Sequence, residues 1–217
     1  MLKANSELFT LTYGVLVNQL ISDYEDIQTV NDQLEKMGWN IGVRLIDEYF
    51  SKVALVSDAA VASSCSSFTE TAESIAKIGF KMFLGISCEV ANVTNDGKAF
   101  SLYMQDNPLS VFVELPTEKV NHETHFCVIL FSLGIISNLS AAAASASASA
   151  HPCPYLQEDL KYSNLICGVI SGALSAVNLR VKATFVRDVL WGDEVNEIRV
   201  ELLEKMSDDV GEAYKEE

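Results

Sequence analysis

The chain has 217 residues, 49% of them hydrophobic, which is enough for one compact domain with a substantial core. Thirty acidic residues outnumber fifteen basic ones, and the formal charge of −15 disfavours binding to nucleic-acid phosphates and to anionic lipid headgroups. The N-terminal segment lacks the unbroken apolar stretch of a secretory signal, which predicts a cytosolic protein with reduced thiols. The cysteines stand at no metal-ligand spacing, so we expect neither a disulfide framework nor a zinc site.

Helices are predicted in the first part of the chain. The first two show apolar residues at helical spacing: Phe9, Tyr13, Leu16 and Leu20 in one, and Val30, Leu34, Met37, Ile41 and Leu45 in the other. Ser6 is the expected cap of the first. In the second, Gly38 and Gly42 lie one turn apart and allow another backbone to approach closely, most simply that of a packed helix.

Cys65 lies in a turn of small polar residues, 63–67, directly before a third helix that begins at Phe68. The exposed N–H groups and the positive dipole end of a helix N-terminus favour a thiolate, and a thiolate is the form of cysteine that reacts covalently. Position alone therefore makes Cys65 a candidate for covalent modification.

The third helix is expected to carry one apolar face, formed by Phe68, Ala72, Ile75, Gly79 and Met82. Gly79 interrupts the larger side chains with a gap. A gap beneath a reactive thiol could hold an acyl chain. The alternative is a small residue that lets two helices pack closely beside a structural cysteine, and the pattern alone favours this alternative.

Strands are predicted in the second part, separated by a late helix over residues 162–177. A turn at 95–97 precedes alternating apolar residues at 100–104, a second strand is expected at 111–115, and two more at 181–185 and 198–202 flank a turn at 191–193. The resulting order, α-α-α-β-β-α-β-β, has no βαβ repetition. It predicts an α+β fold with helices packed on one side of a small antiparallel sheet.

We expect a single domain over residues 1–217, with a low-complexity insert at about 120–158 and a charged tail at about 207–217. Residues 126–150 carry no charge and end in an Ala/Ser repeat, which is too weakly apolar to be a convincing membrane span. A flexible insert is the preferred interpretation, and a translated intron is the alternative.

Catalytic constellations are not evident. There is no Gly-rich phosphate loop, and His122, His125 and His151 all fall in the insert region without the spacing of two ligands on one helix face. Three hypotheses remain: a scaffold subunit of a larger complex, a stand-alone lipid-binding or lipid-carrying module, and a thiol-dependent enzyme.

Ordered motifs along almost the whole chain carry a family resemblance. They lie at residues 6–14, 37–46, 65–82, 107–109, 112–116 and 162–165. Together they resemble the Bet-three type of small core subunit of TRAPP, the transport protein particle that tethers vesicles at the Golgi. Residues 53–62 and the insert depart from the family pattern.

The resemblance implies a non-catalytic subunit that forms a heterodimer with a related small subunit. The assembled complex is a nucleotide-exchange factor for a Rab-family GTPase in transport from the endoplasmic reticulum to the Golgi, and the tail at 207–217 is the part nearest that GTPase. It implies a cytoplasmic protein, peripheral at the cis-Golgi and endoplasmic reticulum membranes. The resemblance also favours the hypothesis that palmitate is bound as a thioester to Cys65. Its chain would then lie in a channel lined by Phe68, Ala72, Ile75, Gly79 and Met82. No metal, nucleotide cofactor or nucleic-acid partner is expected.

Overall fold

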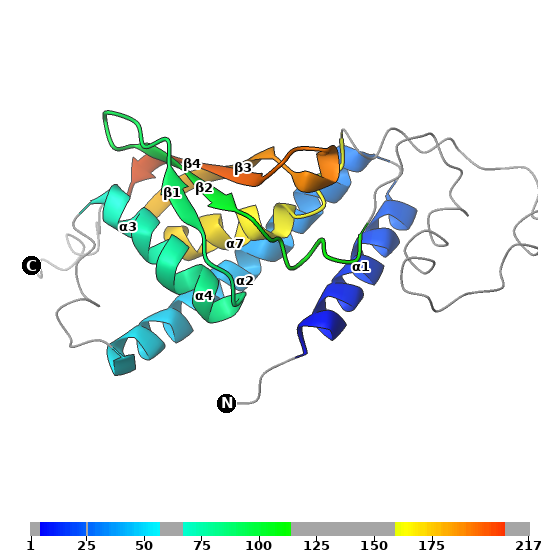
Figure 1. Ribbon diagram of the computed structural model, residues 1–217, viewed down its shortest axis with the longest axis horizontal. Helices are drawn as coiled ribbons and strands as arrows, with labels where there is room; N and C mark the ends of the chain where they lie inside the picture. Colours follow the sequence, from blue (N-terminus) through cyan, green and yellow to red (C-terminus); the bar gives the residue numbers. More distant parts are fainter. Residues whose placement is uncertain (1–4, 25, 57–66, 114–158, 207–217) are drawn as a thin grey trace, which may run out of the picture.

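A four-stranded antiparallel sheet covers one side of a set of helices in the computed structural model, which describes residues 5–24, 26–56, 67–113 and 159–206 (Figure 1). The helical elements are α1 (Ser6–Asp23), α2 (Ile27–Val56), α3 (Phe68–Ser74), the π-helical turn η1 (Ile75–Gly79), α4 (Phe80–Phe83), α7 (Asn164–Ser175) and the 3-10 turn η2 (Val189–Trp191). The strands are β1 (Glu89–Ala91), β2 (Ala99–Met104), β3 (Leu179–Arg187) and β4 (Asn196–Lys205). The predicted α+β class, with helices on one side of a small antiparallel sheet, is confirmed.

The sheet has the strand order β1-β2-β4-β3. The apolar alternation of β2 is matched across the sheet, because Phe100 pairs with Val200 and Leu102 with Ile198. All four of these side chains are buried, and they face the helices beneath the sheet.

One predicted strand is wrong within the described residues. Residues 111–113 belong to consecutive turns, in which Ser110 N–H donates to the Asn107 carbonyl and Val113 N–H donates to the Ser110 carbonyl. These short-range bonds use the backbone groups that a strand would offer to a neighbour. The edge position beside β2 is taken by β1, a three-residue strand outside the predicted elements.

Helix α7 lies between the sheet and the long helix α2, and its backbone contacts that of α2 directly (Figure 1). A Cβ atom added to Gly38 would lie 2.0 Å from the Leu165 carbonyl oxygen, and one added to Gly42 would lie 2.1 Å from that of Val169. Glycines of α7 meet α2 in the same way: the Cβ positions of Gly168 and Gly172 fall 2.1 and 2.2 Å from the carbonyl oxygens of Glu35 and Trp39. The predicted close packing at Gly38 and Gly42 is therefore confirmed, and the backbone packed there is that of α7 in the same chain.

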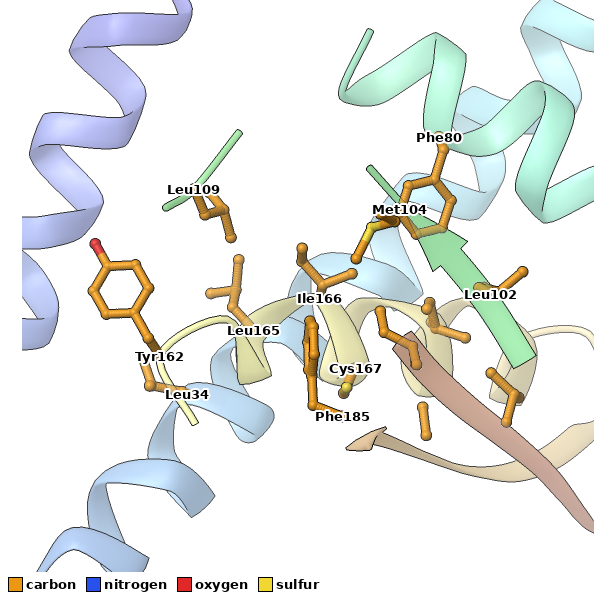
Figure 2. Close-up of a cluster of buried hydrophobic side chains, with 14 of the residues drawn as sticks. Leu34, Phe80, Leu102, Met104, Leu109, Tyr162, Leu165, Ile166, Cys167 and Phe185 are labelled. Atoms are coloured by element: carbon orange, nitrogen blue, oxygen red, sulfur yellow. The ribbon is translucent and has the colours of Figure 1, made fainter. Parts of the chain in front are cut away.

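The core lies between α7, the sheet and the helices α1 to α4. Figure 2 shows part of it, with the Phe80 ring reaching in from the start of α4 toward Met104 on β2. Near the other end of the cluster, the side chain of Tyr162 points toward α1.

A pair of tyrosines anchors α1. The Tyr13 hydroxyl donates a hydrogen bond to the Tyr162 carbonyl oxygen, and the two rings meet edge to face at 5.2 Å between centroids. Burial, followed by the proximity of Tyr162, raises the Tyr13 pKa well above its ordinary value. The Tyr162 hydroxyl is also buried, yet it finds no hydrogen-bond partner among the described residues.

Removing one or the other hydroxyl should therefore have opposite effects on the stability of the protein. Tyr13→Phe leaves the Tyr162 carbonyl without its donor and is expected to lower the free energy of unfolding by about 1–2 kcal/mol. Tyr162→Phe removes an unpaired buried hydroxyl and should be neutral or raise stability by up to about 1 kcal/mol. Urea unfolding at an unchanged m value measures both, and a larger loss for Tyr162→Phe than for Tyr13→Phe would contradict this account.

Candidate functional site

The third helix begins where the sequence predicts. Ser67 has extended backbone angles, and its hydroxyl oxygen accepts a hydrogen bond from Glu70 N–H at 3.1 Å, so it is the cap that starts α3 at Phe68. Cys65 lies outside the described residues, two positions before this cap.

The helix does not continue as a regular α-helix. Phe80 N–H donates to the carbonyl of Ile75, five residues back, where an α-helix would use that of Ala76. The Ala76 carbonyl instead accepts from the backbone N–H of Cys88 at 3.3 Å. Cys88 immediately precedes β1, so the π-turn lies where the returning chain is hydrogen-bonded to the helix.

The buried side of this helix matches the predicted apolar face only in part. Phe68 and Ala72 are buried in the core as expected, with the Phe68 ring centroid 5.0 Å from that of Phe100. Beyond them, the buried positions are Ala76 and Phe80, whereas the predicted lining residues Ile75, Gly79 and Met82 are half-buried. Ala76 and Phe80 continue the buried side at four-residue spacing after Ala72, and Ile75 packs against the edge of the core.

Gly79 borders open space. A Cβ atom added there would have one neighbour within 4 Å, the Ser74 carbonyl oxygen at 3.9 Å. Gly79 is half-buried, so this open space lies at the flank of the helix. Whether these residues line a channel stays a prediction.

The two described cysteines, Cys88 and Cys167, are buried and unpaired. Burial raises the pKa of the Cys88 thiol to about 12. It also raises the Cys167 pKa, with a smaller contribution from the nearby Glu35 carboxylate. Both thiols are thus protonated at neutral pH and poor nucleophiles.

The residues that the structure describes show neither a cluster of metal-ligating side chains nor a helix able to cross a bilayer. Residues 5–24, 26–56, 67–113 and 159–206 contain no group of three or more His, Cys, Asp or Glu side chains that could hold a metal ion. None of the described helices combines the length and the apolarity that crossing a bilayer requires.

An exposed apolar surface is the second candidate site. Helix α1 presents Leu8, Phe9, Val15 and Leu16 to solvent, with Leu8 65% and Val15 56% exposed, although its other face is already buried. An apolar stripe left exposed beside the buried face of a helix is expected to be covered by another surface. The apolar residues that predict this helix belong to two different faces. Tyr13 and Leu20 lie in the core, whereas Phe9 and Leu16 lie on the surface.

Helix α2 adds exposed Trp39, Ile41 and Phe50 to the apolar surface of the molecule. Gly38 and Gly42 do not contribute, because α7 covers them. These two glycines are therefore not available to a partner subunit.

Comparison with known proteins identifies the family. The sequence profile of the transport protein particle (TRAPP) component family matches residues 9–159. The chain is 43% identical to trafficking protein particle complex subunit 3 of Dictyostelium discoideum, over 98% of this chain and 90% of that protein. It is 35% identical to trafficking protein particle complex subunit BET3 of Saccharomyces cerevisiae, over 96% and 86% of the two chains.

A solved structure has the same fold. The crystal structure of a trafficking protein particle complex subunit 3 from Naegleria fowleri, covalently bound to palmitic acid, matches with a TM-score of 0.71 and 40% sequence identity. The match covers 94% of this chain and 98% of that one. From the profile match and these relatives, the chain belongs to the TRAPP component family, as a Bet3-type subunit.

Proposed function

We propose that the protein is a non-catalytic core subunit of the TRAPP tethering complex in vesicle transport from the endoplasmic reticulum to the Golgi. The observation that carries this proposal is the similarity to complex subunits along almost the whole chain. The Dictyostelium relative is 43% identical in sequence over 98% of the residues of this chain. The protein acts in the cytoplasm and associates peripherally with cis-Golgi and endoplasmic reticulum membranes.

A related small subunit is the proposed direct partner, and α1 is the proposed contact surface. Leu8 and Val15 lie seven residues apart on one side of α1, so they form a stripe that a helix of a partner would cover. Burying such a stripe removes apolar area from water, which drives association of subunits.

Co-expression with each related small subunit tests this contact. We expect Leu8→Glu and Val15→Glu to weaken co-purification at least tenfold, because each places a charge in an apolar interface. Leu203→Glu is the matched control, since Leu203 on β4 is a similarly exposed leucine, 59% against 65% for Leu8. Equal loss with the control, or no partner at all, would contradict the scaffold role.

The proposed contribution to Rab activation belongs to the assembled complex. Such a complex accelerates nucleotide exchange by binding more tightly to the GTPase conformation that holds nucleotide poorly. The acidic tail at 207–217 lies outside the described residues and carries no residue-level assignment.

We further propose that Cys65 carries a palmitoyl group, with its chain along the helix that starts at Phe68. The Naegleria subunit bound to palmitic acid and the open space beside Gly79 support this. The Cys65 thiolate attacks the carbonyl carbon of an acyl thioester donor, so that a new C–S bond forms and the donor's C–S bond breaks. The donor leaves as a thiolate and takes up the proton that the Cys65 thiol has lost. Phe68, Ala72, Ile75, Gly79 and Met82 are the proposed channel residues.

Intact-mass measurement tests the acyl group. Wild-type protein should carry one palmitoyl mass that hydroxylamine removes, and Cys65→Ser should carry none. Cys88→Ser is the control and should keep the adduct, because the Cys88 thiol is buried and its pKa is raised to about 12. Turnover of an acyl donor without a resident mass would instead favour a thiol-dependent enzyme.

A further inference from the structure

Three of the sequence motifs, residues 6–14, 107–109 and 162–165, meet in the structure at the start of α1. The Asn107 side-chain amide donates to the Ser163 hydroxyl at 2.7 Å, and both residues are buried. The Asn107 side-chain oxygen also accepts from Leu109 N–H at 3.1 Å. Residues 107–109 and 162–163 are thereby joined into one platform beneath α1.

Two hydroxyl groups hold the start of α1 on this platform. The Thr10 hydroxyl lies 2.8 Å from the Pro108 carbonyl oxygen, and the Tyr13 hydroxyl donates to the Tyr162 carbonyl oxygen. Among the hydrogen bonds between described residues, these two connect residues 6–13 with a distant part of the chain. In this stretch of the helix, Thr10 and Tyr13 are also the buried residues. The placement of this half of α1 therefore depends on these two side chains.

The same half of α1 carries the exposed side chains of Leu8 and Phe9. Leu8 belongs to the stripe that is the proposed contact surface for a partner. The Thr10 hydroxyl has one hydrogen to donate, and the Ser6 carbonyl oxygen of its own helix is a second acceptor at 3.0 Å. The helix can therefore leave the platform without breaking its internal hydrogen bonds, and the stripe would then lose its fixed orientation.

We propose that Thr10 and Tyr13 are positioning residues, whose hydroxyl groups hold the first half of α1 on the platform and so present Leu8 to the partner subunit. This proposal rests on the proposed contact with a related small subunit and adds how its surface is kept ready. A partner that binds only the docked helix has an affinity proportional to the fraction of molecules in which the helix is docked. Loss of the two hydroxyl groups lowers that fraction, although both groups are buried away from the stripe.

Amide exchange and partner affinity of the full-length protein test the positioning role. We expect Thr10→Val and Tyr13→Phe each to speed exchange of the amides of residues 10–13 at least fivefold, because each removes one donor to the platform. The double variant should bind at least fivefold more weakly to the related small subunit that is recovered with the wild-type chain by co-expression. Thr10→Ser keeps the hydroxyl group and should match wild-type protein in both measurements.

Val200→Ala is the matched control for a general loss of stability. Val200 is buried in the middle of the sheet, between Phe100 of β2 and Ala183 of β3, and its truncation should lower Tm by leaving a cavity. We expect wild-type exchange at residues 10–13 and wild-type partner affinity in this variant. An equal loss of affinity in Val200→Ala and in the double variant would overturn the positioning role.

The outcomes also separate this role from the proposed function. If Leu8→Glu weakens partner binding but a folded double variant binds as wild-type protein does, the positioning role is wrong and the scaffold function stands. Unchanged exchange at residues 10–13 in both single variants leads to the same conclusion. A wild-type chain that binds no related small subunit would overturn both. If Tyr13→Phe does not fold, the comparison of Thr10→Val with Thr10→Ser decides alone.

Discussion

Gly42→Ala is expected to lower the free energy of unfolding by about 3 kcal/mol or more, at the upper end of what overpacking causes. The added Cβ atom would lie 2.1 Å from the Val169 carbonyl oxygen and 2.7 Å from the Ala173 nitrogen. Both are backbone atoms of α7, which cannot rotate away as a side chain can. The helices must separate, and the core between α7 and the sheet is disturbed with them.

Thermal unfolding measures the effect. For a chain of 150–250 residues each 1 kcal/mol shifts Tm by about 2–4 °C, so Gly42→Ala should lower Tm by about 6–12 °C. Gly172→Ala, on α7, should lower Tm by a similar amount, since its Cβ would lie 2.2 Å from the Trp39 carbonyl oxygen.

Gly79→Ala is the matched control for this prediction. It is also a helical glycine with negative φ, but its Cβ would meet only the Ser74 carbonyl oxygen at 3.9 Å. Alanine is favoured over glycine in helices by about 1 kcal/mol, so in hydroxylamine-treated protein, which carries no acyl group, the control should be neutral or stabilising. A Gly42→Ala protein with wild-type Tm would mean that α2 and α7 are not packed backbone to backbone.

Local patterns account for the parts of the fold that the sequence predicts correctly. The apolar spacing of the early helices, the alternation around Leu102 and the turn at Gly192 are short-range signals, and these elements form where expected. The predicted cap Ser6 is wrong, because the Asn5 side chain accepts from the N–H groups of Glu7 and Leu8 and so caps α1 one residue earlier. The strand β1 could not be found in this way. It is three residues long, with an exposed Glu89, and its pairing depends on β2 alone.

The π-turn escapes sequence periodicity for a different reason. Helical spacing assumes that each N–H bonds four residues back, but the Ala76 carbonyl is taken by the amide of Cys88, twelve residues later. That contact exists only after the chain has returned toward the sheet. Sequence spacing therefore predicts the burial of Phe68 and Ala72, but neither the π-turn nor the burial of Ala76 and Phe80.

Acylation is expected to raise the stability of the protein by several kcal/mol. A sixteen-carbon chain has about fifteen methylene or methyl groups, each contributing about 0.8 kcal/mol when removed from water, so burial of one third contributes about 4 kcal/mol. At about 2–4 °C per kcal/mol, the acylated protein should melt about 8–16 °C above hydroxylamine-treated protein. Cys65→Ser should have the same Tm as hydroxylamine-treated protein. Added palmitic acid should restore part of the difference in Tm, because the cavity for the chain remains.

Gly79→Leu separates the cavity from the thiol. Its side chain enters open space next to the helix, so the variant should fold, but it would fill the gap that the chain requires. We expect it to lose the palmitoyl mass although Cys65 is present, and to show no stabilisation by palmitic acid, whereas Gly79→Ala should keep part of the adduct. If Gly79→Leu retained both the full acyl mass and the wild-type Tm, the channel would have to lie elsewhere. If wild-type protein never carried the mass, Cys65 would be an ordinary cysteine before a helix.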